Sequence, residues 1–417
     1  MGQNKRKIIN DPVLGFVSIP SDFLYDIIQH PYFQRLNRIR QLGMSYMVYP
    51  GAQHSRFLHS LGALNLMSEA ITQLKSKGNI ITDEEAEAVL ATILLHDVGH
   101  APFSHVLEHL FTSGITHEDI SLEIMKQLNK EFNGKLDLCI EIFQDKYPKK
   151  FLHQLVSSQL DMDRLDYLIR DSFYTGVVEG AVGTERIIKM LNVWNDNLCV
   201  EAKGIYSIEK FLIARRIMYW QVYYHKTSVA AERVLVNLLQ RAKDLTKEGV
   251  DLEAPTWFKY FLNHTASYSD FSENGEALRH YVKFDDSDII SVAKAWESSS
   301  DKVLSTLSSC FSNRHLFKVK IQEKPIDKNV ISKLETEYER VLGIPKELAH
   351  YFYSEVSVST NTYSHKNNNS PIYILYPNGQ VKDIADVSEI LDISMMTKEV
   401  ERKYYFCYYN KGIEIDL

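Results

Sequence analysis

The stretch His96-Asp97-Val98-Gly99-His100 decides how this chain is organised. It follows the apolar run 89–95, which predicts a buried helix that ends by presenting a histidine beside an aspartate. Imidazole and carboxylate together form a mixed nitrogen and oxygen ligand set that suits a divalent metal ion. A His-Asp pair taken alone is most often a satisfied polar pair, so the interpretation depends on what the other segments contribute.

Three other segments carry residues of the same chemical kinds: Arg56-Phe57-Leu58-His59, Thr116-His117-Glu118 and Asp161-Met162-Asp163-Arg164-Leu165-Asp166-Tyr167. Together with the first stretch they supply two imidazoles and two carboxylates to one ion, from His59, His96, Asp97 and Asp163. His59 alone would be interpreted as a half-buried polar residue, but the joint pattern predicts a metal site.

The composition is that of a soluble globular protein with two to three domains. The chain has 417 residues, of which 45% are hydrophobic and 24% charged. The net charge of −7 argues against a broad nucleic-acid-binding surface. The four cysteines show no CxxC spacing, which indicates reduced thiols. No apolar run reaches the length of a membrane span and the start lacks a signal peptide's apolar core, so we expect a cytoplasmic protein.

The periodicity predicts a mostly α fold, with a helical domain over 1–310 and a smaller α+β region over 311–417. Thr82 with Glu85 matches a capping box, and Thr116 with Asp119 is a second N-cap pair. We expect helices over 21–42, 56–77, 150–173, 208–246 and 328–342, and one from Thr82 to His96. We expect hairpins over 6–20 and 199–206, and strands over 317–321, 354–359, 372–376 and 404–409.

Two helical faces combine charges with aromatic rings. Asp163, Arg164, Tyr167, Arg170 and Asp171 fall within about 120° of one helix face, so we expect them to point into one cavity. The alternative is a solvated face with i,i+4 pairs.

A second face, on the long helix expected over 208–246, carries Arg215, Tyr219, Tyr223 and Lys226 within about 80°. A stripe of this kind fits a ligand with phosphates at its ends and a sugar or base between. A tyrosine-rich core face with basic tips that reach solvent is the alternative.

Arg56, Arg164, Arg215 and Lys226 beside a metal suit a polyphosphate, because arginine forks match phosphate oxygens and a metal polarises the phosphoryl centre. His100, His105 and His117 are candidates for proton transfer, with Glu108 and Glu118 to orient them or balance their charge. A position in the first turn of a helix disfavours protonation of His117 until anionic phosphates bind.

These residues resemble the HD superfamily of metal-dependent phosphohydrolases, and most closely its deoxynucleoside triphosphate (dNTP) triphosphohydrolase branch. The resemblance extends from about Asp11 to Glu232 and is specific. The matching motifs occur in the family's order: Gln34-Arg35-Leu36, Gln41-Leu42-Gly43, Tyr49-Pro50-Gly51-Ala52 through His54, Arg56-Phe57, His59-Ser60-Leu61-Gly62, His96-Asp97-Val98-Gly99-His100, Pro102-Phe103-Ser104-His105, His117-Glu118, Asp163-Arg164, Asp166-Tyr167, Arg170-Asp171 and His225-Lys226.

The resemblance implies a helical HD fold and a role for each residue type. Metal ligands would be His59, His96, Asp97 and Asp163, and phosphates would be held by Arg56, Arg164, Arg215 and Lys226. His100, Glu108 and His117 would form the proton network, with His105 also beside the scissile bond. Gln41 and Asp171 would contact the sugar 3′-hydroxyl, Leu42 would face the base and Tyr223 would pack on the sugar. Glu118 is a further candidate for the proton network, and Tyr167 and Tyr219 are further candidates for sugar or base contacts. Glu108 and Tyr219 depart from the Asp and His of the animal members, and the second change puts fine substrate contacts in doubt.

The function predicted is metal-dependent hydrolysis of dNTPs to deoxynucleoside and inorganic triphosphate, with one divalent ion (Mn, Mg, Fe, Zn or Ni) and an additional Mg ion on the nucleotide phosphates. The alternatives are a nucleotide phosphodiesterase or nucleoside monophosphatase, and a catalytically silent nucleotide-sensing scaffold. The resemblance also implies a homo-oligomer, dimer or tetramer, with an allosteric nucleotide at subunit junctions. Gln29 and Asn37 replace the acidic residue and arginine that read guanine in the animal members, so GTP should not be a required activator.

Overall fold

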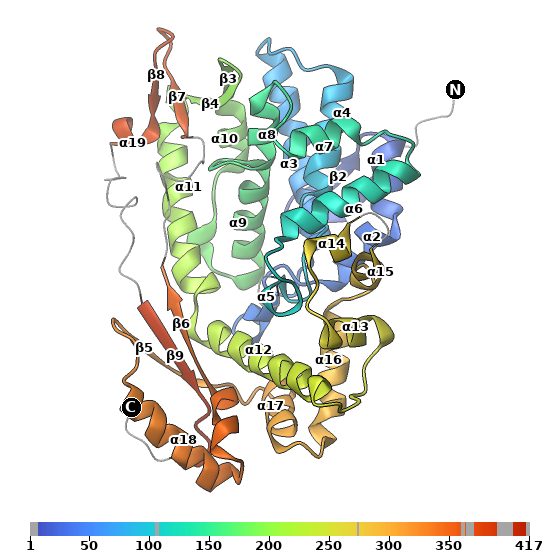
Figure 1. Ribbon diagram of the computed structural model, residues 1–417. Helices are drawn as coiled ribbons and strands as arrows, with labels where there is room; N and C mark the ends of the chain where they lie inside the picture. Colours follow the sequence, from blue (N-terminus) through green and yellow to red (C-terminus); the bar gives the residue numbers. More distant parts are fainter. Residues whose placement is uncertain are drawn as a thin grey trace.

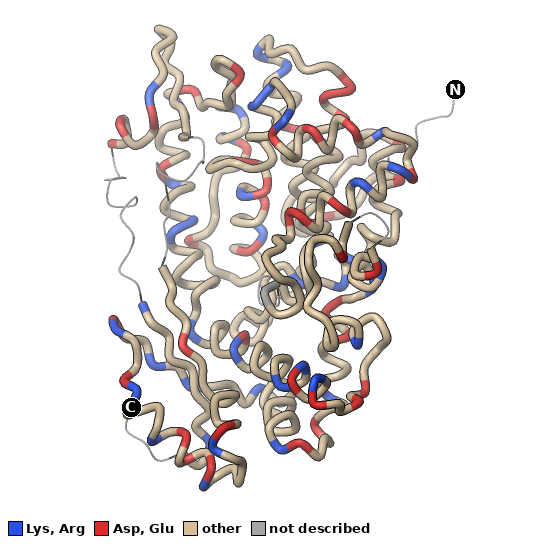
Figure 2. Tube along the Cα trace, in the orientation of Figure 1, with Lys and Arg blue, Asp and Glu red and all other residues tan. Residues whose placement is uncertain are grey.

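The computed structural model describes residues 7–104, 108–272, 275–359, 363, 371–389 and 403–413, with the backbone alone for residues 108 and 109. Within them the fold is mostly helical, with small sheets at the periphery, as the sequence predicted (Figure 1). Acidic and basic residues are interspersed along the trace (Figure 2). No helix in these ranges is both long and apolar enough to cross a bilayer.

The chain begins with the predicted hairpin, β1 (Lys7–Asp11) paired with β2 (Gly15–Ile19). The expected helix over 21–42 is instead divided into α1 (Asp22–Gln29), α2 (Pro31–Gln34) and a 3₁₀ helix (Arg35–Arg38). Pro31 is the cause, because its ring cannot continue α1 but fits the first position of α2. A second 3₁₀ helix (Gly43–Met47) then leads toward the central helices.

The central helices are α3 (Arg56–Ser76), α4 (Asp83–Leu95) and α9 (Met162–Thr175), and α3 packs against both of the others. The capping boxes predicted at Thr82 and Thr116 are present and start α4 and α6 (His117–Glu131). The first turn of α3, the end of α4 and the first turn of α9 therefore meet in the middle of the molecule. Between α4 and α9 lie α5 (Glu108–Phe111), α6, α7 (Asp137–Phe143) and α8 (Lys150–Val156).

The prediction of one continuous helix over 150–173 was wrong, because residues 157–161 separate α8 from α9. Asp161 caps α9 by accepting the Arg164 amide, and its other oxygen accepts the Ser158 amide. One short acidic side chain thus ends a loop and starts a helix, which helical periodicity does not reveal.

The second hairpin is also displaced from its predicted position. It is formed by β3 (Leu191–Trp194) and β4 (Asn197–Glu201), after the short helix α10 (Thr184–Met190). Gly204, Ile205 and Tyr206, which were expected in a strand, lead into α11 (Ile205–Met218) instead. The turn at Asn195 and Asp196 adopts positive φ, a conformation that these two residue types tolerate better than most.

The long helix predicted over 208–246 is interrupted. A π-helical segment (Tyr219–Tyr223) follows α11, and α12 (Lys226–Lys247) begins after it with His225 as its N-cap. The Tyr49 hydroxyl donates to the Gln221 carbonyl at 2.5 Å, so a tertiary contact satisfies a backbone group within the interruption. The regular stripe predicted from Arg215 to Lys226 therefore does not exist as such.

Six short elements follow α12 in the sequence, and the first and the last of them pack against it. They are α13 (Thr256–Asn263), α14 (Tyr268–Phe271), α15 (Glu276–Tyr281), α16 (Asp286–Ala295), a 3₁₀ turn (Trp296–Ser298) and α17 (Lys302–Ser312). Phe258 of α13 stacks at 4.8 Å on Phe284, which lies in the loop before α16, and both rings are buried.

The C-terminal strands lie where they were expected, at one side of the helical body (Figure 1). A three-stranded sheet in the order β5-β9-β6 comprises β5 (Lys318–Gln322), β6 (Tyr353–Val358) and β9 (Lys403–Tyr408), and α18 (Lys328–Leu342) accompanies it. The short strands β7 (Tyr373–Leu375) and β8 (Val381–Asp383) extend the β3–β4 hairpin into a four-stranded sheet, followed by α19 (Ile384–Val387).

Candidate active site

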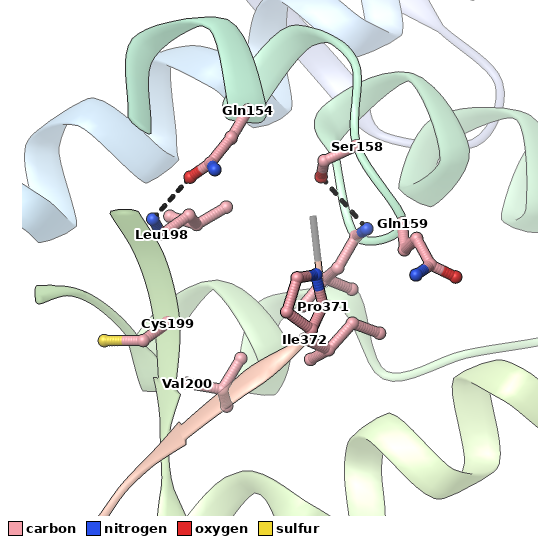
Figure 3. A pocket seen from close by; sticks show the side chains of 9 residues that line it. Gln154, Ser158, Gln159, Leu198, Cys199, Val200, Pro371 and Ile372 are labelled. Atoms are coloured by element: carbon pink, nitrogen blue, oxygen red, sulfur yellow. Dashed lines mark hydrogen bonds between the residues drawn. The ribbon is translucent and has the colours of Figure 1, made fainter. Parts of the chain in front are cut away.

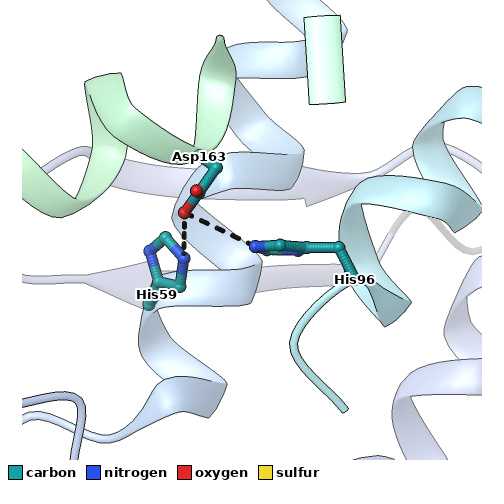
Figure 4. A group of neighbouring side chains, drawn as sticks. All are labelled: His59, His96 and Asp163. Carbon is teal, nitrogen blue, oxygen red and sulfur yellow. Dashed lines mark ion pairs between the residues drawn. The ribbon is translucent and has the colours of Figure 1, made fainter. Parts of the chain in front are cut away.

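The four predicted metal ligands meet at the junction of α3, α4 and α9. Asp163 Oδ1 lies 3.0 Å from His59 Nε2 and 3.4 Å from His96 Nε2 (Figure 4). Asp97 approaches both imidazoles, at 3.7 Å from His59 and 3.4 Å from His96. Both Nε2 atoms are buried and lack a geometrically acceptable hydrogen bond among the described residues, as expected of nitrogens directed at an ion.

The electrostatic field at this junction favours a positive charge. Burial opposes protonation of His59, but the neighbouring carboxylates of Asp163 and Asp166 outweigh burial and raise the pKa of His59 to about 10. Burial would raise the pKa of Asp163, but His59 and His96 hold it well below its usual range. A proton and a metal ion are alternative ways to satisfy such a field, so the residues present fit a divalent ion.

Both imidazoles are oriented by their second nitrogen. His59 Nδ1 lies 2.8 Å from Asp166, and His96 Nδ1 lies 2.6 Å from the Ile93 carbonyl. Asp166 is in turn held by the Arg170 guanidinium at 2.8 Å, which also donates to Asp11 at 2.7 Å. The expectation that Arg170 points into the cavity was therefore wrong, because two buried carboxylates bind it on the opposite side.

This arrangement also explains a glycine of the HSLG motif. A Cβ on Gly62 would lie 2.0 Å from Asp166 and 2.1 Å from the Arg170 guanidinium. Only glycine leaves room for the ion pair behind His59, a reason that the motif alone does not reveal.

A second cluster lies beside the first and shares Asp97 with it. Ligand atoms of Asp97, His100 and His117 lie within 4.8 Å of one another. The rings of His100 and His117 stack at 3.9 Å, and His100 Nε2 is 3.2 Å from Asp97. Burial and then the charge of Arg56 hold the pKa of His100 well below its usual range, so this imidazole is neutral. A neutral imidazole accepts a proton or transmits one through a hydrogen bond.

The other proton-network candidates lie in different situations. Glu118 is exposed, with a carboxylate oxygen 3.5 Å from His117 Nε2, and it does not line the cavity. His105 lies outside the described residues. Glu108 begins α5, and its side chain is likewise outside the part of the chain that the structure describes.

A cavity of about 630 Å³ opens from the two clusters. The predicted residues on its wall are Gln41, Leu42, Arg56, Asp97, His100, His117, Asp163, Arg164, Tyr167, Asp171, Tyr219 and Tyr223. Gly43, Ser45, Phe103, Ser104, Tyr224 and Glu232 complete the wall and were not predicted as site residues.

The four predicted phosphate-binding cations lie in four different situations. Arg56 is buried, where it donates to Asp97 and to the Ser104 hydroxyl. Arg164 reaches the cavity wall with Nε held by the Ser158 carbonyl at 2.6 Å. Arg215 is buried over the Tyr219 ring, and its Nε and Nη1 have no hydrogen-bond partner among the described residues. Lys226, the first residue of α12, is exposed and does not line the cavity.

The expected sugar contacts form a connected group. The Tyr223 hydroxyl donates to Asp171 at 2.7 Å, and His54 Nε2 lies 2.8 Å from the other Asp171 oxygen. His54 is buried and stacks on Tyr174 at 4.5 Å. The motif that runs from Tyr49 through His54 does not by itself predict that His54 holds Asp171 in place. The Gln41 side-chain oxygen is buried without a partner within the described ranges.

A second cavity lies where the α8–α9 loop meets β4 and the approach to β7, near Gln154, Ser158 and Ile372 (Figure 3). Its volume of about 20 Å³ is room for a water molecule, so a nucleotide does not fit there.

Comparison with known proteins agrees with this geometry. The HD domain model matches residues 56–170, and the HD associated region matches residues 182–255. The chain is 33% identical to the uncharacterized protein YwfO of Bacillus subtilis, over 97% of this chain and 92% of that protein. The crystal structure of a phosphohydrolase from Bacteroides thetaiotaomicron is 56% identical, with a TM-score of 0.93 and coverage of 97% of this chain and 100% of that one.

The chain therefore belongs to the HD superfamily of phosphohydrolases. Its further relatives place it on the dNTP triphosphohydrolase-like branch of that superfamily. One of them is the deoxynucleoside triphosphate triphosphohydrolase SAMHD1 homolog of Dictyostelium discoideum, which is 31% identical over 62% of this chain and 53% of its own length.

Proposed function

We propose that this protein hydrolyses dNTPs to deoxynucleoside and inorganic triphosphate in a metal-dependent reaction. One observation carries the proposal: a single cavity of about 630 Å³ joins Asp97 and Asp163 to Arg164 and to the Asp171–Tyr223 pair. Residues that would hold a metal, a phosphate and a sugar thus surround a volume that suits a small-molecule ligand. The named activity of the SAMHD1-type relatives supports the same substrate class.

The metal would be held by His59, His96, Asp97 and Asp163. When bound, a divalent ion lowers the pKa of a water molecule and draws charge from a phosphoryl oxygen. This set of two imidazoles and two carboxylates accommodates Mn, Fe, Zn, Ni or Mg, and a further Mg ion would accompany the nucleotide phosphates.

The arginines provide phosphate binding. Arg164 presents its guanidinium at the cavity wall, and Arg215 lies behind Tyr219 with donors that no described residue accepts. A buried donor without an acceptor is costly, and a phosphate oxygen within reach would remove that cost. Arg56 is already paired with Asp97, so we assign it to orienting that ligand as well as to charge neutralisation.

In the reaction the oxygen of water bonds to the α-phosphorus and the bond from phosphorus to the 5′-oxygen breaks. The bonding electron pair leaves with the 5′-oxygen, which takes a proton and completes the deoxynucleoside. The water oxygen stays on the triphosphate, and the water releases its proton to solvent. His117 and His105 are the candidate donors, and His117 reaches the cavity wall against the neutral His100 ring. Catalysis would then consist mainly of positioning and charge stabilisation.

We also propose that the active form is a cytoplasmic homo-oligomer, dimer or tetramer, with a nucleotide at its junctions, and that GTP is not a required activator. The side chains of Gln29 and Asn37 are exposed, and the Asn37 amide donates a hydrogen bond to the Gln34 side-chain oxygen at 3.1 Å. A neutral amide cannot accept both guanine donors as a carboxylate does.

Product analysis tests the proposed function directly. Purified protein with metal and a panel of nucleotides should release inorganic triphosphate and the deoxynucleoside from dNTPs. Orthophosphate or nucleoside monophosphate as the first product would instead identify a monophosphatase or phosphodiesterase. Absence of turnover with every metal and nucleotide would support a silent nucleotide-sensing scaffold.

A further inference from the structure

Part of the cavity wall takes no part in holding the metal, the phosphates or the sugar. The metal clusters, Arg164 and the Asp171–Tyr223 pair account for the phosphates and the sugar. The wall that remains includes Leu42, Gly43, Ser45, Tyr224 and Glu232. By elimination, a nucleotide bound in the proposed way places its base against these residues.

Glu232 differs chemically from the other members of this wall. It lies near the start of α12, and α12 packs against the 3₁₀ helix Gly43–Met47 that carries Ser45. Its side chain is half-buried, and within the described residues its carboxylate forms neither a hydrogen bond nor an ion pair. Burial raises the pKa of Glu232 to about 7 against the opposing charge of Arg233. A partly buried carboxylate without hydrogen bonds is stabilised by any ligand that donates hydrogen bonds to it.

The base edges differ in what they can offer to an acceptor. An ionised carboxylate only accepts hydrogen bonds, and its two oxygens accept two parallel donors. Guanine presents N1–H and the 2-amino group side by side on one edge. Adenine and cytosine place an acceptor beside their amino group, and thymine places carbonyls on both sides of its N3–H. The acceptors of these three bases would face the carboxylate oxygens and repel them.

We propose that Glu232 selects the base: its carboxylate accepts hydrogen bonds from N1–H and the 2-amino group of guanine and so favours dGTP. The inference rests on the proposed function, and it adds a specificity-determining residue outside the catalytic groups. A good bidentate pair discriminates between bases by a factor on the order of tenfold or more.

The test compares three substrates in wild type and Glu232→Gln. In wild type, kcat/KM should be highest for dGTP, lower for dITP, which lacks the 2-amino group, and lower still for dATP. A glutamine amide accepts from the adenine 6-amino group and donates to adenine N1, so Glu232→Gln should reverse the dGTP to dATP ratio. A variant that simply unfolds or weakens the pocket would lower all three rates together and leave their ratio unchanged, which would overturn the proposal.

Glu248→Gln is the matched control, because it makes the same chemical change at the far end of α12, where Glu248 is exposed and does not line the cavity. It should keep the wild-type ratio of dGTP to dATP. Equal kcat/KM for dGTP and dITP in the wild type would also contradict the inference.

Binding of 2′-deoxyguanosine and 2′-deoxyadenosine, measured by calorimetry, separates this inference from the proposed function. If no dNTP is hydrolysed but wild type prefers deoxyguanosine and Glu232→Gln does not, the function fails and the base assignment stands. If triphosphate is released and neither assay shows a change of preference in Glu232→Gln, the function stands and the base assignment fails.

Discussion

The two parts of the cavity are built in opposite ways. At the metal end, protein groups already orient the candidate ligands: Asp166 and the Ile93 carbonyl hold the two imidazoles, Arg56 holds Asp97, and the two Nε2 atoms are left for an ion. At the nucleotide end Gln41 and Arg215 keep buried polar atoms without a partner among the described residues. The metal end is organised before any ligand arrives, while the nucleotide end retains groups that a substrate would satisfy.

The largest effect should follow from removal of a metal ligand. Asp163→Ala, and the double change His96→Ala with Asp97→Ala, should abolish metal-dependent turnover because each removes carboxylate charge from the ion. Thermal melts should show that the proteins remain folded, and Asp26→Ala, an exposed carboxylate on α1, should behave as wild type. Stoichiometric metal binding with normal hydrolysis in the ligand variants would contradict the assignment.

The next prediction distinguishes a residue that orients a metal ligand from a residue that binds the metal itself. Asp166→Asn keeps the shape of the side chain but weakens the partner of His59 Nδ1, so metal affinity should fall by about 10–100-fold. Asp11→Asn is the control, because Asp11 binds the same Arg170 on the side away from His59. Both variants should lose stability in denaturant titrations, and only Asp166→Asn should lose metal affinity in calorimetric titrations. Equal metal affinities in the two variants would show that the buried pair is structural alone.

The metal end was also the part that the sequence predicted best. Its candidate residues stand at or near helix termini with strong local signals: the Thr82 capping box and the apolar run lead to His96, and the Thr116 capping box precedes His117. Short motifs of this kind depend on neighbours within one or two helical turns, so one sequence suffices to recognise them.

The nucleotide end depends on contacts between distant segments, and there the sequence predicted less. The π-helical interruption at Tyr219–Tyr223 is accompanied by a bond from Tyr49, and Arg170 was directed away from the cavity by Asp11. In the sequence, Glu232 resembles any charged residue on a long amphipathic helix. Only the packing of α12 near the 3₁₀ helix Gly43–Met47 shows that it lines the cavity. Periodicity describes a helix face, but not which neighbour covers it.

Sugar selectivity is the third prediction. A Tyr223 ring packed on C2′ leaves no room for a 2′-hydroxyl, so dNTPs should be preferred over ribonucleotides by about 100-fold or more. Tyr223→Ala should narrow this preference, mainly by admitting ribonucleotides. Tyr223→Phe keeps the ring and loses only the bond to Asp171, so it should preserve the preference. The preference is measured as the turnover of dGTP and GTP by all three proteins, with thermal melts to check folding. Equal turnover of dGTP and GTP by the wild type would refute the prediction.

The smallest effect concerns a single neutral hydrogen bond at the nucleotide end. The Gln41 side-chain oxygen is buried without a partner in the described structure, and it stands where the 3′-hydroxyl of the sugar is expected. A neutral hydrogen bond contributes about 0.5–1.5 kcal/mol, so Gln41→Ala should lower kcat/KM for dNTPs by roughly two- to tenfold. A 2′,3′-dideoxynucleoside triphosphate lacks the hydroxyl, so the same substitution should change its kcat/KM little. The difference between the two substrates isolates the bond, because any general loosening of the cavity affects both. An equal loss with both substrates would mean that Gln41 only packs against the wall, and the nucleotide end would then hold the sugar through Asp171 and Tyr223 alone.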